Sequence, residues 1–514
     1  MTTPLRNSLE YWARQRPEDA AIIEGGVVLT YGAWNSRADA LAEGLAKHGV
    51  VAGDVIVTRL QIRKEWPIVA SAAAKLGCSI LGLNWRLTPA ETHYVLSNSK
   101  ASVVICDDPD PAALAPAFEG LRIKLAVSVD VPANGFTALS ELFAPAAPTR
   151  FSQGEAPLII YTSGTTGLPK GVPMSNARGG DPTQLMEYLR SVGESRPQPP
   201  GEVVLVTMPM HHGAGPALVR QSLSRGNLMI FQRRFDPEAA LELIQRHRIS
   251  YWTAVPTMYK RIAGLPAETL ARYDVSSIKT LGVGAAPVPP DLKTWIVGYF
   301  GDCLHEGYGA TEVGMITALT PEMHRLKPGS SGLPHTHVHI RIRDDEGRDL
   351  PVGETGEIWI KTPVTISGYL NADTLGSDTL DAEGFFRIGD VGRLDEDGYL
   401  FITDRVKDMI ISGGVNIYPA EIEAALLKHP AVQDAAVIGI PDDEFGEQVK
   451  AFVELKPGRA AEPEEIIASC AAHLASYKRP RSLDVMTELP RNTMGKLLKR
   501  ELREPYWAGR ERKV

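Results

Sequence analysis

The strongest constraint on the fold is a regular alternation of short apolar runs with amphipathic stretches. Runs such as 55–60 and 79–82 have the length and composition of buried strands, and Tyr31–Lys47 between two such runs has the pattern of a helix. Strands separated by helices of this length are typical of parallel βαβ units. The alternation resumes over 203–283. The sequence therefore predicts an α/β fold built on βαβ subdomains.

The sequence pattern changes twice after this region. Beyond Gly332, short strands alternate with tight turns, which predicts a small antiparallel, β-barrel-like part. From 419 onward a helix, strand, loop pattern repeats, which predicts a compact α+β tail. A chain of 514 residues is too long for one hydrophobic core. We predict a large N-terminal domain over 1–404 and a small, mobile C-terminal domain over 405–514.

Charge and cysteine usage exclude several classes of protein. A formal charge of -8 at pH 7 argues against a chain whose main partner is nucleic acid, because that role requires a basic face. The four cysteines lack CxxC spacing, so neither a disulfide framework nor a zinc site is predicted. Residues 1–15 lack the apolar core of a secretory signal, and no apolar run approaches the ~20 residues that span a bilayer. We expect a cytoplasmic protein without membrane insertion.

One loop, after an apolar strand at 157–160, points to polyphosphate binding. Glycines let backbone N–H groups approach an anion, hydroxyls add donors and lysine adds charge. The spacing of its glycines and lysine differs from Gly-x4-Gly-Lys-Ser/Thr, so this is not a Walker A loop. A surface turn of the same composition is the alternative interpretation. The predicted phosphate contacts are Thr162, Ser163, Gly164, Thr165, Thr166, Gly167 and Lys170.

Further motifs accompany this loop along nearly the whole chain. Together they resemble the adenylate-forming superfamily of acyl-CoA synthetases, firefly luciferase and peptide-synthetase adenylation domains. The resemblance implies ATP-dependent activation of a carboxylic acid as an acyl-adenylate, followed by transfer to a thiol. The segments, besides 161–172, are 84–88, 209–215, 283–287, 307–312 (Gly-Tyr-Gly-Ala-Thr-Glu), 327–334, 389–390, 404–407 (Asp-Arg-Val-Lys), 411–419 and 490–496 (Pro-Arg-Asn-Thr-Met-Gly-Lys).

The resemblance assigns nucleotide and metal contacts. Tyr308 offers an aromatic face to the purine and Asp390 accepts from the ribose, although a simple turn residue is the alternative for Asp390. Glu312 and Thr162 are expected to hold Mg²⁺, which prefers hard oxygen ligands. The other expected ATP contacts are Ala285, Ala286, Glu306, Gly307, Gly309, Thr311, Arg405 and Lys496. Relatives often carry Gln or Asn at the position of Glu306, whose carboxylate can still accept from the adenine amino group.

A lysine near the end of the chain is the predicted catalytic group. By resemblance, Lys496 bridges carboxylate and α-phosphate and stabilises charge in the transition state. A solvated lysine of a basic tail is the alternative. Lys407 matches the family's hinge, about which the small domain rotates between the two half-reactions. The same rotation is expected to bring in a channel for the pantetheine arm of coenzyme A, formed by Ser412, Gly413 and Gly414.

The sequence constrains the identity of the acid least. His212 is a candidate catalytic residue and gate between acyl site and ATP, and Thr311 and Glu312 are the other candidate catalytic residues besides Lys496. Small residues near it predict a pocket for a medium-chain, branched or cyclic acid, whereas close packing is the alternative. These residues are Gly213, Gly215, Gly282 and Val283.

Three histidines, His335, His337 and His339, alternate in sequence. On one strand they would share a face, and we expect the solvated face of an edge strand rather than a metal site.

The leading hypothesis is an acid:CoA ligase that uses ATP, Mg²⁺ and coenzyme A and releases AMP and pyrophosphate. The principal rival loads the phosphopantetheine thiol of a carrier protein. The sequence is also compatible with a phosphotransferase and with a non-catalytic nucleotide-binding relative. The oligomeric state, a homodimer among the options, is left open.

Overall fold

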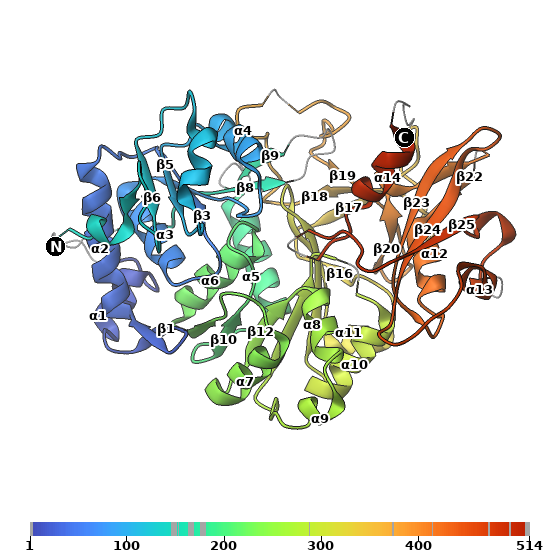
Figure 1. Cartoon of the computed structure of the whole chain (residues 1–514), viewed down its shortest axis with the longest axis horizontal. Coiled ribbons are helices and arrows are strands. Elements are labelled where there is room, and N and C mark those ends of the chain that lie inside the picture. Colours follow the sequence, from blue (N-terminus) through green and yellow to red (C-terminus); the bar gives the residue numbers. More distant parts are fainter. Residues whose placement is uncertain are drawn as a thin grey trace.

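The structure is a computed structural model. It describes residues 4–144, 152, 154–162, 169–174, 181–286, 288–372, 375–413, 415–470, 473–492 and 495–508. Figure 1 shows the chain running from an N-terminal α/β part at the left to a smaller C-terminal domain at the right. The predicted α/β class with a large and a small domain is confirmed.

Two βαβ sheets form most of the N-terminal part. The first has the strand order β7-β6-β5-β3-β4-β8-β9 and is parallel except for the β8–β9 pair. Its strands are short apolar runs buried on both faces, as parallel sheets require. They are β3 (Val55–Arg59), β4 (Ser79–Gly82), β5 (Val103–Cys106), β6 (Leu125–Ser128), β7 (Thr137–Ala138), β8 (Leu158–Thr162) and β9 (Lys170–Pro173).

The second sheet has the order β16-β15-β14-β13-β12-β10-β11-β1-β2, with a parallel centre and antiparallel edges. In this register Gly284 pairs with Gly307, so the end of β13 lies beside the middle of β14. The strands are β1 (Ala20–Glu24), β2 (Val27–Thr30), β10 (Val203–Val206), β11 (Leu228–Phe231), β12 (Tyr251–Ala254), β13 (Thr280–Gly284), β14 (Leu304–Ala310), β15 (Gly314–Leu319) and β16 (Leu333–Pro334).

Helices cover these sheets and bury large aromatic side chains against them. Trp34 and Trp66 lie in one core, and Trp252 and Tyr259 lie in the other. The helices are α1 (Leu9–Gln15), α2 (Tyr31–Lys47), α3 (Glu65–Leu76), α4 (Pro89–Ser99), η1 (Pro111–Phe118), η2 (Leu139–Leu142), α5 (Pro182–Ser195), α6 (Ala214–Arg225), α7 (Pro237–His247), α8 (Pro256–Ala263), α9 (Ala267–Leu270), α10 (Pro290–Phe300) and α11 (Pro321–Leu326). Within the described residues, no helix is long and apolar enough to cross a membrane.

The predicted small antiparallel part is a sheet of the order β17-β18-β19-β20. Its strands are β17 (His339–Arg343), β18 (Gly356–Lys361), β19 (Phe386–Leu394) and β20 (Leu400–Arg405). The prediction that three alternating histidines share one strand face is wrong. His335 precedes the strand and is buried, His337 has a left-handed φ of 62°, and of the three only His339 lies on β17.

The C-terminal domain packs helices on one mixed sheet. The strand β24 pairs with β23 and β21 in antiparallel fashion and with β25 in parallel fashion. Buried aliphatic side chains fill the space between this sheet and α12. The elements are η3 (Val406–Asp408), β21 (Ile410–Ser412), β22 (Val415–Ile417), α12 (Pro419–Leu426), β23 (Val432–Asp442), β24 (Gly446–Leu455), α13 (Pro463–Ser469), η5 (Ser476–Lys478), β25 (Ser482–Met486) and α14 (Lys499–Trp507).

Candidate active site

The two predicted metal ligands meet between the two large sheets. Thr162, at the end of β8, donates through Oγ1 to Oε1 of Glu312 at 3.2 Å. Tyr369 donates to the same oxygen at 3.3 Å, and its ring lies 4.9 Å from Nζ of Lys170. Lys170 begins β9 and pairs with Thr162 across the β8–β9 ladder. A hydroxyl, a carboxylate and a lysine are thus concentrated at the two ends of the predicted phosphate loop.

A second cluster surrounds Asp390 on β19. The hydroxyl of Tyr308 donates to Oδ2 of Asp390 at 2.5 Å, and Nε of Arg405 lies 2.9 Å from Oδ1. Burial and the Asp390 carboxylate raise the pKa of Tyr308 well above its usual range. Oδ1 is buried and accepts no hydrogen bond of good geometry from the described part of the chain. It therefore retains acceptor capacity for a ligand hydroxyl.

The other predicted nucleotide residues lie at the ends of neighbouring strands. Ala285 and Ala286 directly follow β13, and Ala285 holds a left-handed φ of 68°. Gly307 and Gly309 lie on β14, and Thr311 lies in the turn between β14 and β15. This is the carboxyl edge of a parallel sheet, where open α/β sheets bind their ligands.

The predicted adenine contact Glu306 already has partners in the protein. Its Oε1 lies 2.5 Å from Nζ of Lys293 on α10 and 3.1 Å from Nε2 of His324 on α11. Burial raises the pKa of the Glu306 carboxyl, and Lys293 opposes that rise. Burial lowers the pKa of His324 to about 4. Lys293 therefore balances most of the charge of Glu306.

Lys496 reaches into the Asp390 cluster from the C-terminal domain. Its backbone N–H donates to the side chain of Asn492 at 2.9 Å, which closes the tight turn that carries it. Burial, followed by the neighbouring charges of Arg405 and Lys407, lowers the pKa of Lys496 to about 8. A solvated tail lysine would show neither burial nor this lowering. The structure thus places Lys496 beside the predicted ribose-binding carboxylate.

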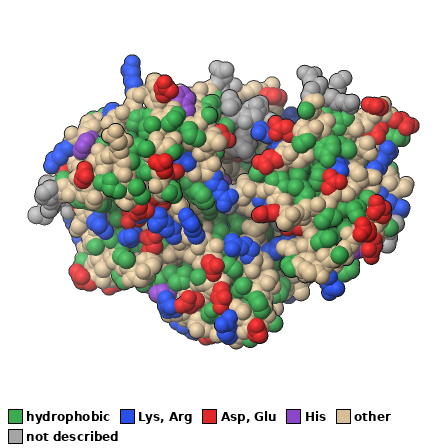
Figure 2. Space-filling view, in the orientation of Figure 1, with side chains coloured by type: hydrophobic (Ala, Val, Ile, Leu, Met, Phe, Trp, Pro, Cys, Tyr) green, Lys and Arg blue, Asp and Glu red, His purple; other side chains and the backbone are tan. Residues whose placement is uncertain are grey.

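Contacts with α8 hold this lysine-bearing turn on the N-terminal part. Nζ of Lys260 on α8 lies 3.0 Å from Oδ2 of Asp434 on β23, and Asp434 also pairs with Arg491. Gly495 has a φ of 72°, and a Cβ built on it would overlap the side chain of Thr257 on α8. In Figure 2, Lys and Arg side chains gather on this face along the line where the two parts of the molecule meet.

The predicted hinge and thiol channel lie at the start of the C-terminal domain. Lys407 lies in η3, where Arg503 of α14 donates to its carbonyl oxygen at 3.1 Å and to the adjacent Asp408 at 2.7 Å. Ser412 ends β21, and the N–H of Gly413 donates to the carbonyl of Phe445 at 2.8 Å. Segment 406–408 is therefore tied to the C-terminal helix.

The predicted acyl-site residues divide into packed and open positions. His212 lies beside His211, with ring centroids 4.5 Å apart, and burial lowers the pKa of His212 to about 4. A Cβ at Gly215 would overlap backbone carbonyls, and one at Gly282 would overlap the side chain of Thr253. Gly213 has open space around its α-carbon. Close packing thus accounts for Gly215 and Gly282. Val283 is fully buried in β13.

Several predicted contacts lie outside the described residues. They are Ser163, Gly164, Thr165, Thr166 and Gly167 of the phosphate loop and Gly414 of the thiol channel.

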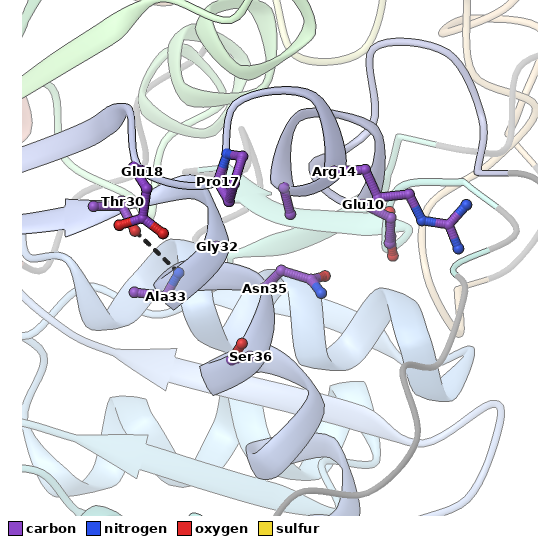
Figure 3. Close-up of a pocket in the computed structure, with 10 residues that line it drawn as sticks. Glu10, Arg14, Pro17, Glu18, Thr30, Gly32, Ala33, Asn35 and Ser36 are labelled. Carbon is purple, nitrogen blue, oxygen red and sulfur yellow. Dashed lines mark hydrogen bonds between the residues drawn. The ribbon is translucent and has the colours of Figure 1, made fainter.

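A surface hollow elsewhere in the chain has no part in this chemistry. It lies between α1 and α2 and is lined by Glu10, Arg14, Thr30 and Asn35 among others, none of them a predicted site residue (Figure 3). Glu10 and Asn35 both accept from Lys75, at 3.0 and 2.9 Å. The polar lining is therefore engaged in the protein's own contacts.

Some residues of the site gave no signal in the sequence. Tyr369, Lys260, Thr257 and Asp434 belong to no motif, and their parts depend on contacts between distant segments. Arg196, which follows α5 and donates to the carbonyl of Val283, lies outside these motifs as well. An isolated basic or aromatic residue between motifs has no spacing that could reveal it.

Two α/β sheets, a carboxylate–hydroxyl pair between them, and a lysine delivered by a small second domain are the features of an adenylate-forming enzyme. The chain belongs to the family of AMP-binding enzymes, whose main domain matches residues 9–370 and whose C-terminal domain matches residues 421–496.

Relatives within the family differ in their named substrates. The chain is 34% identical over 496 residues to a feruloyl-CoA synthase of Amycolatopsis, covering 96% of this chain and 97% of that protein. It is 30% identical to the fatty acid–[acyl-carrier-protein] ligase ScoC of Streptomyces coeruleorubidus, covering 99% and 98%. The o-succinylbenzoate CoA synthetase of Bacillus subtilis, solved with its acyl-adenylate, superimposes with a TM-score of 0.82 at 30% identity, covering 98% of each chain.

Proposed function

We propose that this enzyme is an acid:CoA ligase that forms an acyl-adenylate and then an acyl-CoA thioester. The observation that carries the proposal is the position of Lys496, which is half-buried within electrostatic reach of Arg405 and Asp390 although it belongs to the other domain. One active site that catalyses two successive steps needs a catalytic side chain that is present in one step and can be withdrawn for the other. The relatives named as CoA ligases support the choice of thiol.

In the first step a carboxylate oxygen of the acid attacks the α-phosphorus of ATP, and the bond to pyrophosphate breaks. Negative charge accumulates on the α-phosphate and the attacking carboxylate in the transition state. Lys496 is placed to hold that charge from one side, and Lys170 is placed to hold the departing phosphates from the other. Preorganised charges of this kind are usually the largest single contribution to catalysis.

The nucleotide is held by groups that the fold has already oriented. Asp390 is fixed by Tyr308 through Oδ2 and by Arg405 through Oδ1, and Oδ1 keeps acceptor capacity for a ribose hydroxyl beside that ion pair. The ring of Tyr308 is fixed by the same bond and presents a face to the purine. Residues Thr162 and Glu312 fit Mg²⁺, because both offer hard oxygens 3.2 Å apart next to the phosphate loop. When bound, the ion would neutralise charge on the phosphates.

In the second step the thiol sulfur, as thiolate, attacks the acyl carbon, the bond to the phosphate oxygen breaks, and AMP leaves. Lys496 has no role in this step, so the C-terminal domain rotates about Lys407 and brings Ser412 and Gly413 to the site. Enclosure of the mixed anhydride during both steps excludes water. We place the boundary between the two moving bodies at residues 404–405.

A carrier-protein thiol is the second candidate acceptor. It is favoured by the likeness to the fatty acid–[acyl-carrier-protein] ligase over 99% of this chain. Free coenzyme A decides between the two. A CoA ligase yields the CoA thioester with free CoA, whereas a carrier loader releases pyrophosphate on adenylation but forms no CoA thioester.

Product analysis with labelled ATP and a panel of carboxylic acids tests the proposal as a whole. We expect AMP and pyrophosphate in equal amounts, formed only when an acid is present. ADP and phosphate instead would identify a phosphotransferase and overturn adenylation. Neither product with any acid would favour a non-catalytic nucleotide-binding protein.

A further inference from the structure

Arg196, the residue after α5, lies against the sheet at the point where acid and nucleotide are expected to meet. Its Nη2 donates to the carbonyl of Val283 at 3.2 Å. A Cβ built on Gly307 would overlap its guanidinium, and one built on Gly284 would lie 3.8 Å from Nη2. The absence of side chains at these two paired glycines is what lets the guanidinium lie on the strands. The hydrogen bond to Val283 and the close approach to Gly307 therefore hold the guanidinium of Arg196 against β13 and β14.

Arg196 acts on one carboxylate without pairing closely with it: burial raises the pKa of Glu306, and Lys293 and then Arg196 oppose that rise. Among the residues that the structure describes, no Asp or Glu lies within ion-pair distance of Arg196. Glu306, on the neighbouring strand, is paired with Lys293. Two histidines lie on this side of the sheet. His305 bonds the carbonyl of Ser195, and burial together with Arg196 lowers the pKa of His335 to about 4.

The position of Arg196 relative to the nucleotide residues is set by strand register. Gly284 precedes Ala285, and Gly307 precedes Tyr308. Successive side chains on a strand point to opposite faces, so Tyr308 faces Asp390 while Gly307 faces Arg196 and α5. An acid whose reacting carboxylate lies at the carboxyl end of these strands can therefore extend along the α5 side toward Arg196.

We propose that Arg196 binds a second carboxylate at the far end of the substrate, so that the preferred substrates are dicarboxylic acids. A guanidinium presents a planar fork of donors that matches a carboxylate, and one of these donors is already oriented by Val283. A partly buried cation whose neighbouring carboxylate, Glu306, is already paired with Lys293 gains most from a ligand that supplies an anion of its own. The proposal rests on the adenylation function and names the class of acid.

The test compares matched acids on two variants. Unbranched α,ω-dicarboxylates of increasing length are assayed for pyrophosphate release beside monocarboxylates of the same lengths, together with cinnamate and its para-carboxy derivative. We expect the best dicarboxylate to exceed its monocarboxylate about a hundredfold in kcat/KM, and Arg196→Met to abolish that difference while monocarboxylates react unchanged. Arg196→Lys keeps the charge but not the fork and retains part of the preference. Arg190→Met, which removes an exposed arginine of α5 paired with Glu194, is the control.

The outcomes separate the two proposals. If monocarboxylates are adenylated as well as dicarboxylates, or if Arg196→Met weakens all acids equally through the KM for ATP, the assignment of Arg196 is wrong and adenylation stands. If no acid releases pyrophosphate, both proposals fall. Unchanged activity of Arg196→Met on monocarboxylates also shows that the variant is folded.

Discussion

The two halves of the active site are built in different ways. The predicted nucleotide half is formed by residues on strands or in the turn after β14, which bond in two pairs, Thr162 with Glu312 and Tyr308 with Asp390. The lysine half is a single turn of another domain. Its described contacts with α8 include the ion pair of Lys260 with Asp434, the hydrogen bond from Lys260 to the carbonyl of Gln433 and the tight contact of Gly495 with Thr257. A half built on strands keeps its geometry throughout turnover, whereas a half held by few contacts can leave. We therefore expect residues of the first half to serve both steps and those of the second to serve one.

The largest expected effect comes from the strand-built half. Glu312→Gln removes the charged oxygen that Thr162 and Tyr369 orient, and we expect acyl-AMP formation to fall about a thousandfold, since charge stabilisation at phosphates contributes several kcal/mol. Single-turnover pyrophosphate release measures it. Glu322→Gln, an exposed carboxylate on α11, is the control and should leave the rate unchanged. A loss of less than tenfold would remove Glu312 from the metal site.

A methyl group at the tight contact should impair only the docked half. Gly495→Ala places a Cβ against Thr257 and displaces the turn that carries Lys496, and misplacement of about 1 Å costs up to a hundredfold in rate. We expect adenylation to fall tens of times and thioester formation from supplied acyl-AMP to persist. Gly458→Ala has the same left-handed φ without a neighbour within 4 Å, so it reproduces the strain without the overlap.

Relief of that overlap gives a second check on the tight contact. Thr257→Ala removes two of the overlapping atoms and should recover part of the adenylation rate of the Gly495→Ala variant. Equal impairment by Gly495→Ala and Gly458→Ala, or no recovery, would show that backbone strain alone is responsible.

The pH dependence should reveal the docked lysine. Burial and the neighbouring cations Arg405 and Lys407 lower the pKa of Lys496 to about 8, so raising the pH through this value removes its charge. We expect the kcat/KM for ATP in adenylation to be constant below pH 8 and to fall up to about tenfold per pH unit above it. Thioester formation from acyl-AMP should not share this limb. A fall beginning only near the pKa of an ordinary lysine would contradict the buried position.

The smallest effect should come from the ion pair between domains. Lys260→Ala removes a partly exposed partner of Asp434, and such pairs contribute about 1 kcal/mol or less, so adenylation should fall only severalfold. Lys279→Ala breaks a pair of the same 3.0 Å length within the N-terminal part and should leave the ratio of the two half-reactions unchanged. A shift of that ratio by the Lys279 variant would mean that the ion pair has no special role in docking.

The sequence predicted the strand-built half better than the docked half. Continuous apolar runs such as Ser79–Gly82 and the helix Tyr31–Lys47 were predicted with their observed bounds, because local pattern and burial agree there. The prediction that the three alternating histidines share one strand face was wrong, because His337 has a left-handed φ that interrupts the extended backbone. The contacts of Lys260 with Asp434, of Gly495 with Thr257 and of Arg196 with Gly307 join segments far apart in the chain, and no local periodicity encodes them.

Lys496 should serve adenylation alone if the two halves of the site separate between the steps. The most direct measurement compares the two half-reactions of Lys496→Ala, with pyrophosphate release for the first and thioester formation from supplied acyl-AMP for the second. We predict a loss of roughly two to three orders of magnitude in the first, the effect of one preorganised charge, and near wild-type rates in the second. Equal loss in both half-reactions would contradict the rotation of the C-terminal domain between the two steps.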